Sequence, residues 1–153
     1  MTESSEDRLY YTYDYIHHHT LKLINAISEK HSSIDYIVGI SRGGLVPAVT
    51  MSHHMGLPLI PVQWSTRDHS QRVHNLAIAE DLQGGATILL VDDINDSGKT
   101  FVELIEDWEY NSESEGRLIT ASIFQRYTTQ MPSDFHSKMI NSDAWVVMPW
   151  EKH

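Results

Sequence analysis

Three aspartates and a Ser-Gly-Lys-Thr run stand together between residues 92 and 100 of this chain. Asp92, Asp93 and Asp96 come first, and 97–100 follow where a buried strand gives way to a predicted helix. Free backbone N–H groups at a helix start favour a bound phosphate, and glycine lets the backbone approach it closely. Carboxylates beside a polyphosphate repel it unless a cation or sugar hydroxyls intervene. The segment therefore predicts a phosphate site with Mg²⁺ beside it.

Two other interpretations of this segment compete with a phosphate–Mg²⁺ site. A Walker A loop also ends in Gly-Lys-Thr, but its spacing would require glycine at position 93, where this chain has Asp93. A turn with helix-capping residues also uses Asp, Asn and Ser. Three aspartates in five residues exceed what such a turn requires, which favours the binding site.

A second turn of similar character is Ser41-Arg42-Gly43-Gly44, which follows the apolar run 36–40. Backbone N–H groups at the start of the next helix, together with the Arg42 guanidinium, would suit an anion. Taken alone, the same residues also fit a surface arginine beside a glycine turn. The segment at 92–100 favours the anion site.

Strands and helices alternate along the chain, which predicts an α/β fold with a parallel sheet. Ligands of such sheets bind at the carboxyl ends of the strands, where both polar segments fall. Residues 64–83 are polar and weakly patterned, and predict a long, mobile functional loop. The expected strands cover 36–40, 57–63, 87–91 and 118–124, the expected helices cover about 13–29, 45–55 and 101–108, and a last apolar segment covers 144–150.

Composition sets limits on the partners of this 153-residue chain. Eleven basic and 21 acidic side chains give a formal net charge of −10, which argues against nucleic-acid binding. The absence of cysteine excludes disulfides, thiolate catalysis and iron–sulfur clusters. The apolar runs are far shorter than the roughly 20 residues of a membrane span, and the acidic start does not resemble a leader. We expect one soluble cytoplasmic domain over 1–153 with a flexible tail at 1–7.

The run Ile88 to Thr100 resembles the signature with which type I phosphoribosyltransferases bind phosphoribosyl pyrophosphate (PRPP). That resemblance implies a mostly parallel sheet flanked by helices, with a small hood from the terminal segments. It also implies that Asp92 and Asp93 hold the ribose hydroxyls and the Mg²⁺ shell. Asp96 would be the acid facing the incoming base. The 5′-phosphate would be gripped by Ser97, Gly98, Lys99 and Thr100.

Residues 40–47 are similar to the pyrophosphate loop of bacterial xanthine-guanine phosphoribosyltransferases, a narrower subfamily. The resemblance implies that Ser41, Arg42, Gly43 and Gly44 bind pyrophosphate, and that Arg72 in the mobile loop assists. It places Arg126, Trp145 and Val146 in a base-binding hood segment over 125–153. The catalytic residues it implies are Asp96, Arg42 and Arg72.

Three departures from the subfamily bear on the substrate. Arg126 stands where the family has lysine, and Val147 stands where the xanthine-guanine enzymes have an acid. The mobile loop reads Ser65-Thr66-Arg67 in place of a Ser-Tyr pair.

The resemblance implies an enzyme that converts PRPP and a 6-oxopurine (hypoxanthine, guanine or xanthine) to a nucleoside monophosphate and pyrophosphate with Mg²⁺, and a homo-oligomer, either a dimer or a tetramer. The alternatives are a non-catalytic PRPP- or nucleotide-sensing regulator of the same fold and an unrelated α/β domain, such as a receiver with a similar Asp pair.

Overall fold

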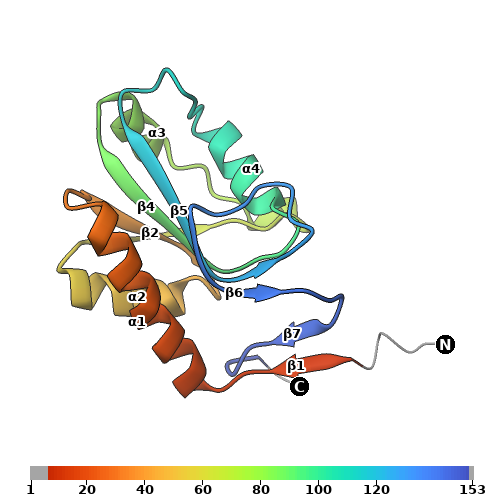
Figure 1. Cartoon of the computed structure of the whole chain (residues 1–153). Coiled ribbons are helices and arrows are strands. Elements are labelled where there is room, and N and C mark those ends of the chain that lie inside the picture. The colour runs from red at the N-terminus through yellow and green to blue at the C-terminus, as the bar shows by residue number, and fades with distance from the viewer. Residues whose placement is uncertain (1–6, 152–153) are drawn as a thin grey trace.

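A five-stranded parallel sheet in the order β3-β2-β4-β5-β6 forms the centre of the computed structural model (Figure 1). The structure describes residues 7–151. The strands are β2 (Tyr36–Ser41), β3 (Leu59–Gln63), β4 (Thr87–Asn95), β5 (Arg117–Arg126) and β6 (Phe135–Ile140). The chain goes outward in one direction from β2 to β3 and in the other from β4 to β6. The topological switch point therefore lies between β2 and β4.

Four helices cover the two faces of this sheet, as the alternation of strands and helices predicted (Figure 1). They are α1 (Tyr13–Lys30), α2 (Leu45–Met55), α3 (Leu76–Gln83) and α4 (Lys99–Asp107). Apolar side chains of β4 alternate between the faces: Leu89 and Val91 pack with α1 and α2, whereas Ile88 and Leu90 pack with α3 and α4. This period of two is the reason why a continuous apolar run fills two cores.

The two terminal segments meet in a separate small sheet. Strands β1 (Arg8–Tyr10) and β7 (Trp145–Val147) run parallel and side by side below the main sheet (Figure 1). This pair corresponds to the predicted hood. The predicted flexible tail at 1–7 lies outside the described residues except for Asp7, whose carbonyl accepts a hydrogen bond from the Trp145 amide.

The structure corrects part of the predicted loop at 64–83. Trp64 is buried, a 3₁₀ turn covers His69–Gln71, and the last eight residues form α3. The helix was missed because the surrounding composition is polar, yet Ile78 and Leu82 at i and i+4 are fully buried. The loop is thus confined to about 65–75, and its mobility stays a prediction.

Three strands also differ from the sequence-based expectation, and the first of them, β1, was not predicted. Strand β4 continues through the acid pair to Asn95, so Asp92 and Asp93 lie on the strand and not in a loop. Strand β6 was not predicted, because its residues alternate weakly between exposed and partly buried positions at the sheet edge. Among the described residues, no helix has the length and apolar character that crossing a bilayer requires.

Helix α4 is attached to the sheet through a few fully buried side chains, of which Leu104 is one. We expect Leu104→Ala to lower the free energy of unfolding by about 2–5 kcal/mol, because a cavity remains in a closely packed core. The matched control is Leu76→Ala, since the Leu76 side chain is 75% exposed and should change stability by no more than about 0.5 kcal/mol. Urea unfolding followed by circular dichroism measures both, and equal losses would contradict this packing.

Candidate active site

The carboxyl ends of β2 and β4 lie against each other at the switch point of the sheet. A Cβ atom added to Gly43 would lie 2.1 Å from Asp93 Oδ2, closer than any side chain tolerates. One added to Gly44 would lie 2.6 Å from both the Ile40 and Val91 carbonyl oxygens. The peptide bond between Ser41 and Arg42 is cis. Glycine is thus required where the two predicted ligand loops touch.

The acid pair at the end of β4 is held by its own backbone. The Asp93 amide donates to Asp92 Oδ1 at 2.9 Å, and the Ile94 amide donates to Asp93 Oδ1 at 2.8 Å. Burial and the neighbouring Asp93 carboxylate raise the pKa of Asp92 well above its ordinary value. Burial also raises the pKa of Asp93. Two adjacent carboxylates in this position are therefore costly unless a cation neutralises them.

The donor set of this pair fits Mg²⁺. Carboxylate oxygens are hard ligands, and Mg²⁺ is commonly held by one or two carboxylates together with substrate phosphates and water. Within residues 7–151 no group of three or more His, Cys, Asp or Glu side chains could hold a metal by itself. Asp92 and Asp93 would thus supply only part of the coordination shell, and a phosphorylated substrate would complete it.

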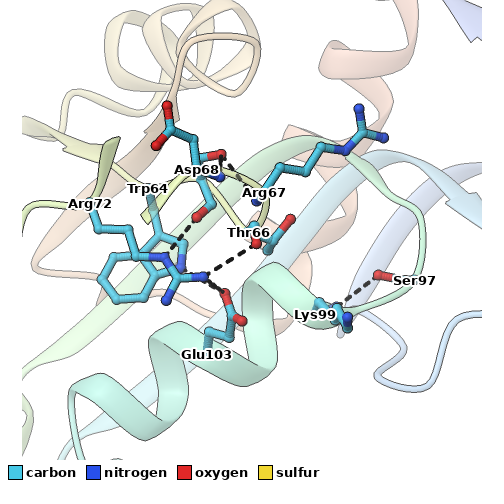
Figure 2. A network of polar contacts seen from close by, with 9 residues as sticks. Trp64, Thr66, Arg67, Asp68, Arg72, Ser97, Lys99 and Glu103 are labelled. Carbon is cyan, nitrogen blue, oxygen red and sulfur yellow. Dashed lines mark hydrogen bonds and ion pairs between the residues drawn. The ribbon is translucent and has the colours of Figure 1, made fainter. Parts of the chain in front are cut away.

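The predicted phosphate loop forms a tight turn at the start of α4. Gly98 has a φ of 90°, and a Cβ atom there would lie 2.7 Å from Thr129 Oγ1, so glycine is required. Ser97 Oγ accepts a hydrogen bond from the Lys99 amide at 3.2 Å (Figure 2). Residues 97–100 line a cavity of about 460 Å³ together with Asp92, Asp93 and Asp96, which we call the Lys99 cavity. The structure therefore brings the whole predicted segment to one place.

The Asn95 side chain binds the segment that follows β5, and no sequence pattern predicted this role. Its buried side-chain amide donates to the Met131 carbonyl at 2.7 Å and to Ser133 Oγ at 3.1 Å. Its side-chain oxygen accepts from Thr129 Oγ1 at 3.0 Å. Asn95 thereby ties the end of β4 to the segment after β5. An isolated asparagine between acids carries no pattern that would reveal such a role.

The base-binding residues implied by the resemblance line a second cavity, of about 750 Å³, which we call the Trp145 cavity. Trp145 is half exposed there, whereas Val146 is buried. Arg126 Nε donates to Asp96 Oδ1 at 2.7 Å, and Arg126 Nη1 donates to the carbonyls of Ser142 and Ala144. The lining consists of Arg42, Gly43, Arg67, Asp93, Ile94, Asp96, Arg126, Trp145, Val146, Met148, Trp150 and Glu151.

Arg72 does not lie where the resemblance placed it. Its Nη2 forms an ion pair with Glu103 at 2.9 Å, its Nε donates to the Ser65 carbonyl at 2.7 Å, and its guanidinium covers the Trp64 ring (Figure 2). Arg72 lines none of the cavities at this site. Arg67 lines them instead, and no sequence pattern marked it as a site residue.

Ser41, Arg42 and Arg67 also line a third cavity of about 710 Å³, which reaches Thr100 and which we call the Gln63 cavity. The three cavities share Arg67, and two of them share Arg42. Apart from Arg72 and the buried Gly44, the predicted site residues thus line three adjoining cavities at the carboxyl edge of the sheet.

Comparison with known proteins agrees with this arrangement. The chain is 30% identical over 125 residues to a xanthine-guanine phosphoribosyltransferase of Idiomarina loihiensis, covering 76% of this chain and 71% of that protein. It is 26% identical over 145 residues to a xanthine-guanine phosphoribosyltransferase of Gluconobacter oxydans, covering 92% and 82%. The crystal structure of a purine phosphoribosyltransferase from Pyrococcus horikoshii superposes with a TM-score of 0.78 at 27% identity over 96% of each chain.

The model of the phosphoribosyl transferase domain matches residues 12–152, which include the acid pair, the phosphate loop and the hood strand β7. The fold, the site and these similarities agree, and the chain belongs to the phosphoribosyl transferase domain family.

Proposed function

We propose that this protein is a Mg²⁺-dependent purine phosphoribosyltransferase that converts PRPP and a 6-oxopurine to a nucleoside monophosphate and pyrophosphate. The observation that supports this most is that the two glycine-containing turns, the acid pair and the Trp145 ring line three adjoining cavities. The named relatives are phosphoribosyltransferases, so a non-catalytic sensing role is not favoured. The family resemblance extends the proposal to a single-domain, cytoplasmic homo-oligomer.

In the proposed reaction the bond from ribose C1 to the pyrophosphate oxygen breaks, and a bond from C1 to a purine ring nitrogen forms. The leaving pyrophosphate gains negative charge, which Arg42 and the backbone amides of 42–44 would stabilise. Asp96 would accept a proton from one imidazole nitrogen of the purine and so make the other nitrogen a better nucleophile. Mg²⁺ held by Asp92 and Asp93 would supply neutralising charge beside the pyrophosphate.

Arg126 could recognise the base through one free hydrogen-bond donor, its Nη2. Its Nε is held by Asp96 and its Nη1 by two carbonyls, whereas Nη2 has no partner in the described part of the chain. A 6-oxopurine presents an acceptor at C6 that this donor could meet, and Trp145 could stack on the ring. Adenine presents an amino group there and would leave the donor unpaired.

The experiment that tests the proposed function measures pyrophosphate release from PRPP and Mg²⁺ with hypoxanthine, guanine, xanthine, adenine, orotate and uracil in turn. We expect hypoxanthine to be used at least as well as guanine, and both about 5- to 150-fold better than adenine in kcat/KM, because an unsatisfied buried donor costs about 1–3 kcal/mol. Adenine as the best substrate would contradict the role of Arg126. No release with any base would contradict the proposed function.

Asp96→Asn should lower kcat by roughly 10²- to 10⁴-fold, because the amide cannot take the purine proton. Its side-chain oxygen can still accept the hydrogen bond from Arg126 Nε, so we expect PRPP affinity to be unchanged. Asp14→Asn, an exposed carboxylate in the first turn of α1, is the control of equal charge change. Steady-state kinetics decide the matter, and wild-type turnover by Asp96→Asn would remove Asp96 from the mechanism.

PRPP binding should require a divalent cation, because Asp92 and Asp93 otherwise repel the pyrophosphate group. Calorimetry should show PRPP affinity at least about tenfold weaker in EDTA than in Mg²⁺. Ribose 5-phosphate, which lacks pyrophosphate, is the control and should depend much less on the cation. Equal PRPP affinity in both buffers would take the cation out of the proposal.

A further inference from the structure

The cations near the site fall into two groups. Arg72 and Arg126 are ion-paired, with Glu103 and Asp96 respectively. The side chains of Arg42, Arg67 and Lys99 have no hydrogen-bond or ion-pair partner among residues 7–151. In a chain with a net charge of −10, three unpartnered cations around one region are available to an anion.

Arg67 holds the central position among these three cations. It lines the Trp145 cavity beside Asp93 and Asp96, the Gln63 cavity beside Arg42, and the Lys99 cavity beside the phosphate loop. No other cation of residues 7–151 lines all three cavities. A charged group that spans from the acid pair to the Ser41–Gly44 turn would therefore pass within reach of the Arg67 guanidinium.

A compact turn places Arg67 at its tip. Ser65 Oγ accepts hydrogen bonds from the amides of Arg67 and Asp68, and Asp68 Oδ1 accepts from the Ser70 amide at 3.0 Å. These contacts make the segment a defined turn. The Arg67 side chain extends from it, away from Glu103 (Figure 2).

The two ends of this turn contact α4 through a cluster of three side chains, Trp64, Arg72 and Glu103. Glu103 Oε1 accepts from Arg72 Nη2 at 2.9 Å and from Trp64 Nε1 at 3.1 Å, and the Arg72 guanidinium lies 4.8 Å from the Trp64 ring centroid (Figure 2). Arg72 Nε also holds the Ser65 carbonyl at 2.7 Å. Because α4 begins at the phosphate loop, this cluster links the position of Arg67 to the loop itself.

We infer that Arg67 contacts the diphosphate group of PRPP and of the pyrophosphate product, and that Arg72 with Glu103 positions it there. The inference rests on the proposed function for the identity of the ligand. Arg67 offsets the repulsion between the diphosphate and the neighbouring acid pair. Arg72 is a positioning residue: its donors are used within the protein, so it acts through the turn that carries Arg67.

The first experiment measures the binding of Mg²⁺–PRPP, Mg²⁺–pyrophosphate and ribose 5-phosphate to Arg67→Gln by calorimetry. We expect affinity for the first two to fall about 10- to 100-fold, the range for a lost charge-assisted hydrogen bond, and affinity for ribose 5-phosphate to change little. Arg117→Gln removes the same charge at the opposite end of β5 and should bind all three like the wild type. Unchanged pyrophosphate affinity in Arg67→Gln would overturn the inference.

The second experiment tests positioning with a double-mutant cycle. Arg72→Met should weaken pyrophosphate binding in the wild-type background, but have little further effect in Arg67→Gln, because there is then no cation left to position. Glu103→Gln should have a smaller effect, since its amide oxygen can still accept from Trp64 and Arg72. If Arg72→Met does not fold, the cycle is run with Glu103→Ala, which removes the acceptor of both Trp64 and Arg72. Additive losses would overturn the role of Arg72.

These outcomes separate the inference from the proposed function. Wild-type protein that binds pyrophosphate but transfers the phosphoribosyl group to none of the bases would contradict the proposed enzyme, while Arg67→Gln would still decide the contact. Wild-type protein that does not bind pyrophosphate or PRPP would overturn both. Turnover in the wild type with unchanged binding by Arg67→Gln would overturn the inference alone.

Discussion

The parallel pairing of β2 with β4 is the constraint on which the site depends. It places the Ser41–Gly44 turn directly against the acid pair, so closely that a single methyl group on Gly43 would collide with Asp93. The contact is possible only because two successive residues lack side chains. A ligand that binds at this edge of the sheet must fit around this junction.

Electrostatics at the junction are unfavourable without a ligand. Burial raises the pKa values of Asp92 and Asp93, the Asp93 carboxylate raises the pKa of Asp92 further, and the chain as a whole is strongly acidic. Arg42, Arg67 and Lys99 have no hydrogen-bond or ion-pair partner for their side chains within residues 7–151, which keeps them available to an incoming anion. The acid pair and the unpartnered cations thus lie around the same cavities without neutralising each other. A diphosphate with its Mg²⁺ would neutralise both.

Arginine has two distinct uses in this protein. Arg126 joins Asp96 to the 142–144 backbone, and Arg72 joins the 65–72 turn to α4. In both cases the planar guanidinium holds several acceptors at once, which lysine's single ammonium does less well. Arg42 and Arg67 instead project into the cavities. Residue type alone does not distinguish an arginine that positions from one that contacts a ligand; the partners do.

By itself the sequence determined four strands of the main sheet, helices α1, α2 and α4, and the two ligand loops, because apolar periodicity and the Asp-rich and glycine-rich motifs are local signals. Helix α3 and strands β1 and β6 were not predicted, because their apolar faces are short. Only the tertiary structure decided which side chains meet: Gly43 with Asp93, Asp96 with Arg126, and Arg72 with Glu103. The last pair joins residues 31 positions apart, on a loop and a helix. Such contacts depend on how the elements pack in three dimensions, so no spacing in the sequence could show that Arg67 and not Arg72 lines the site.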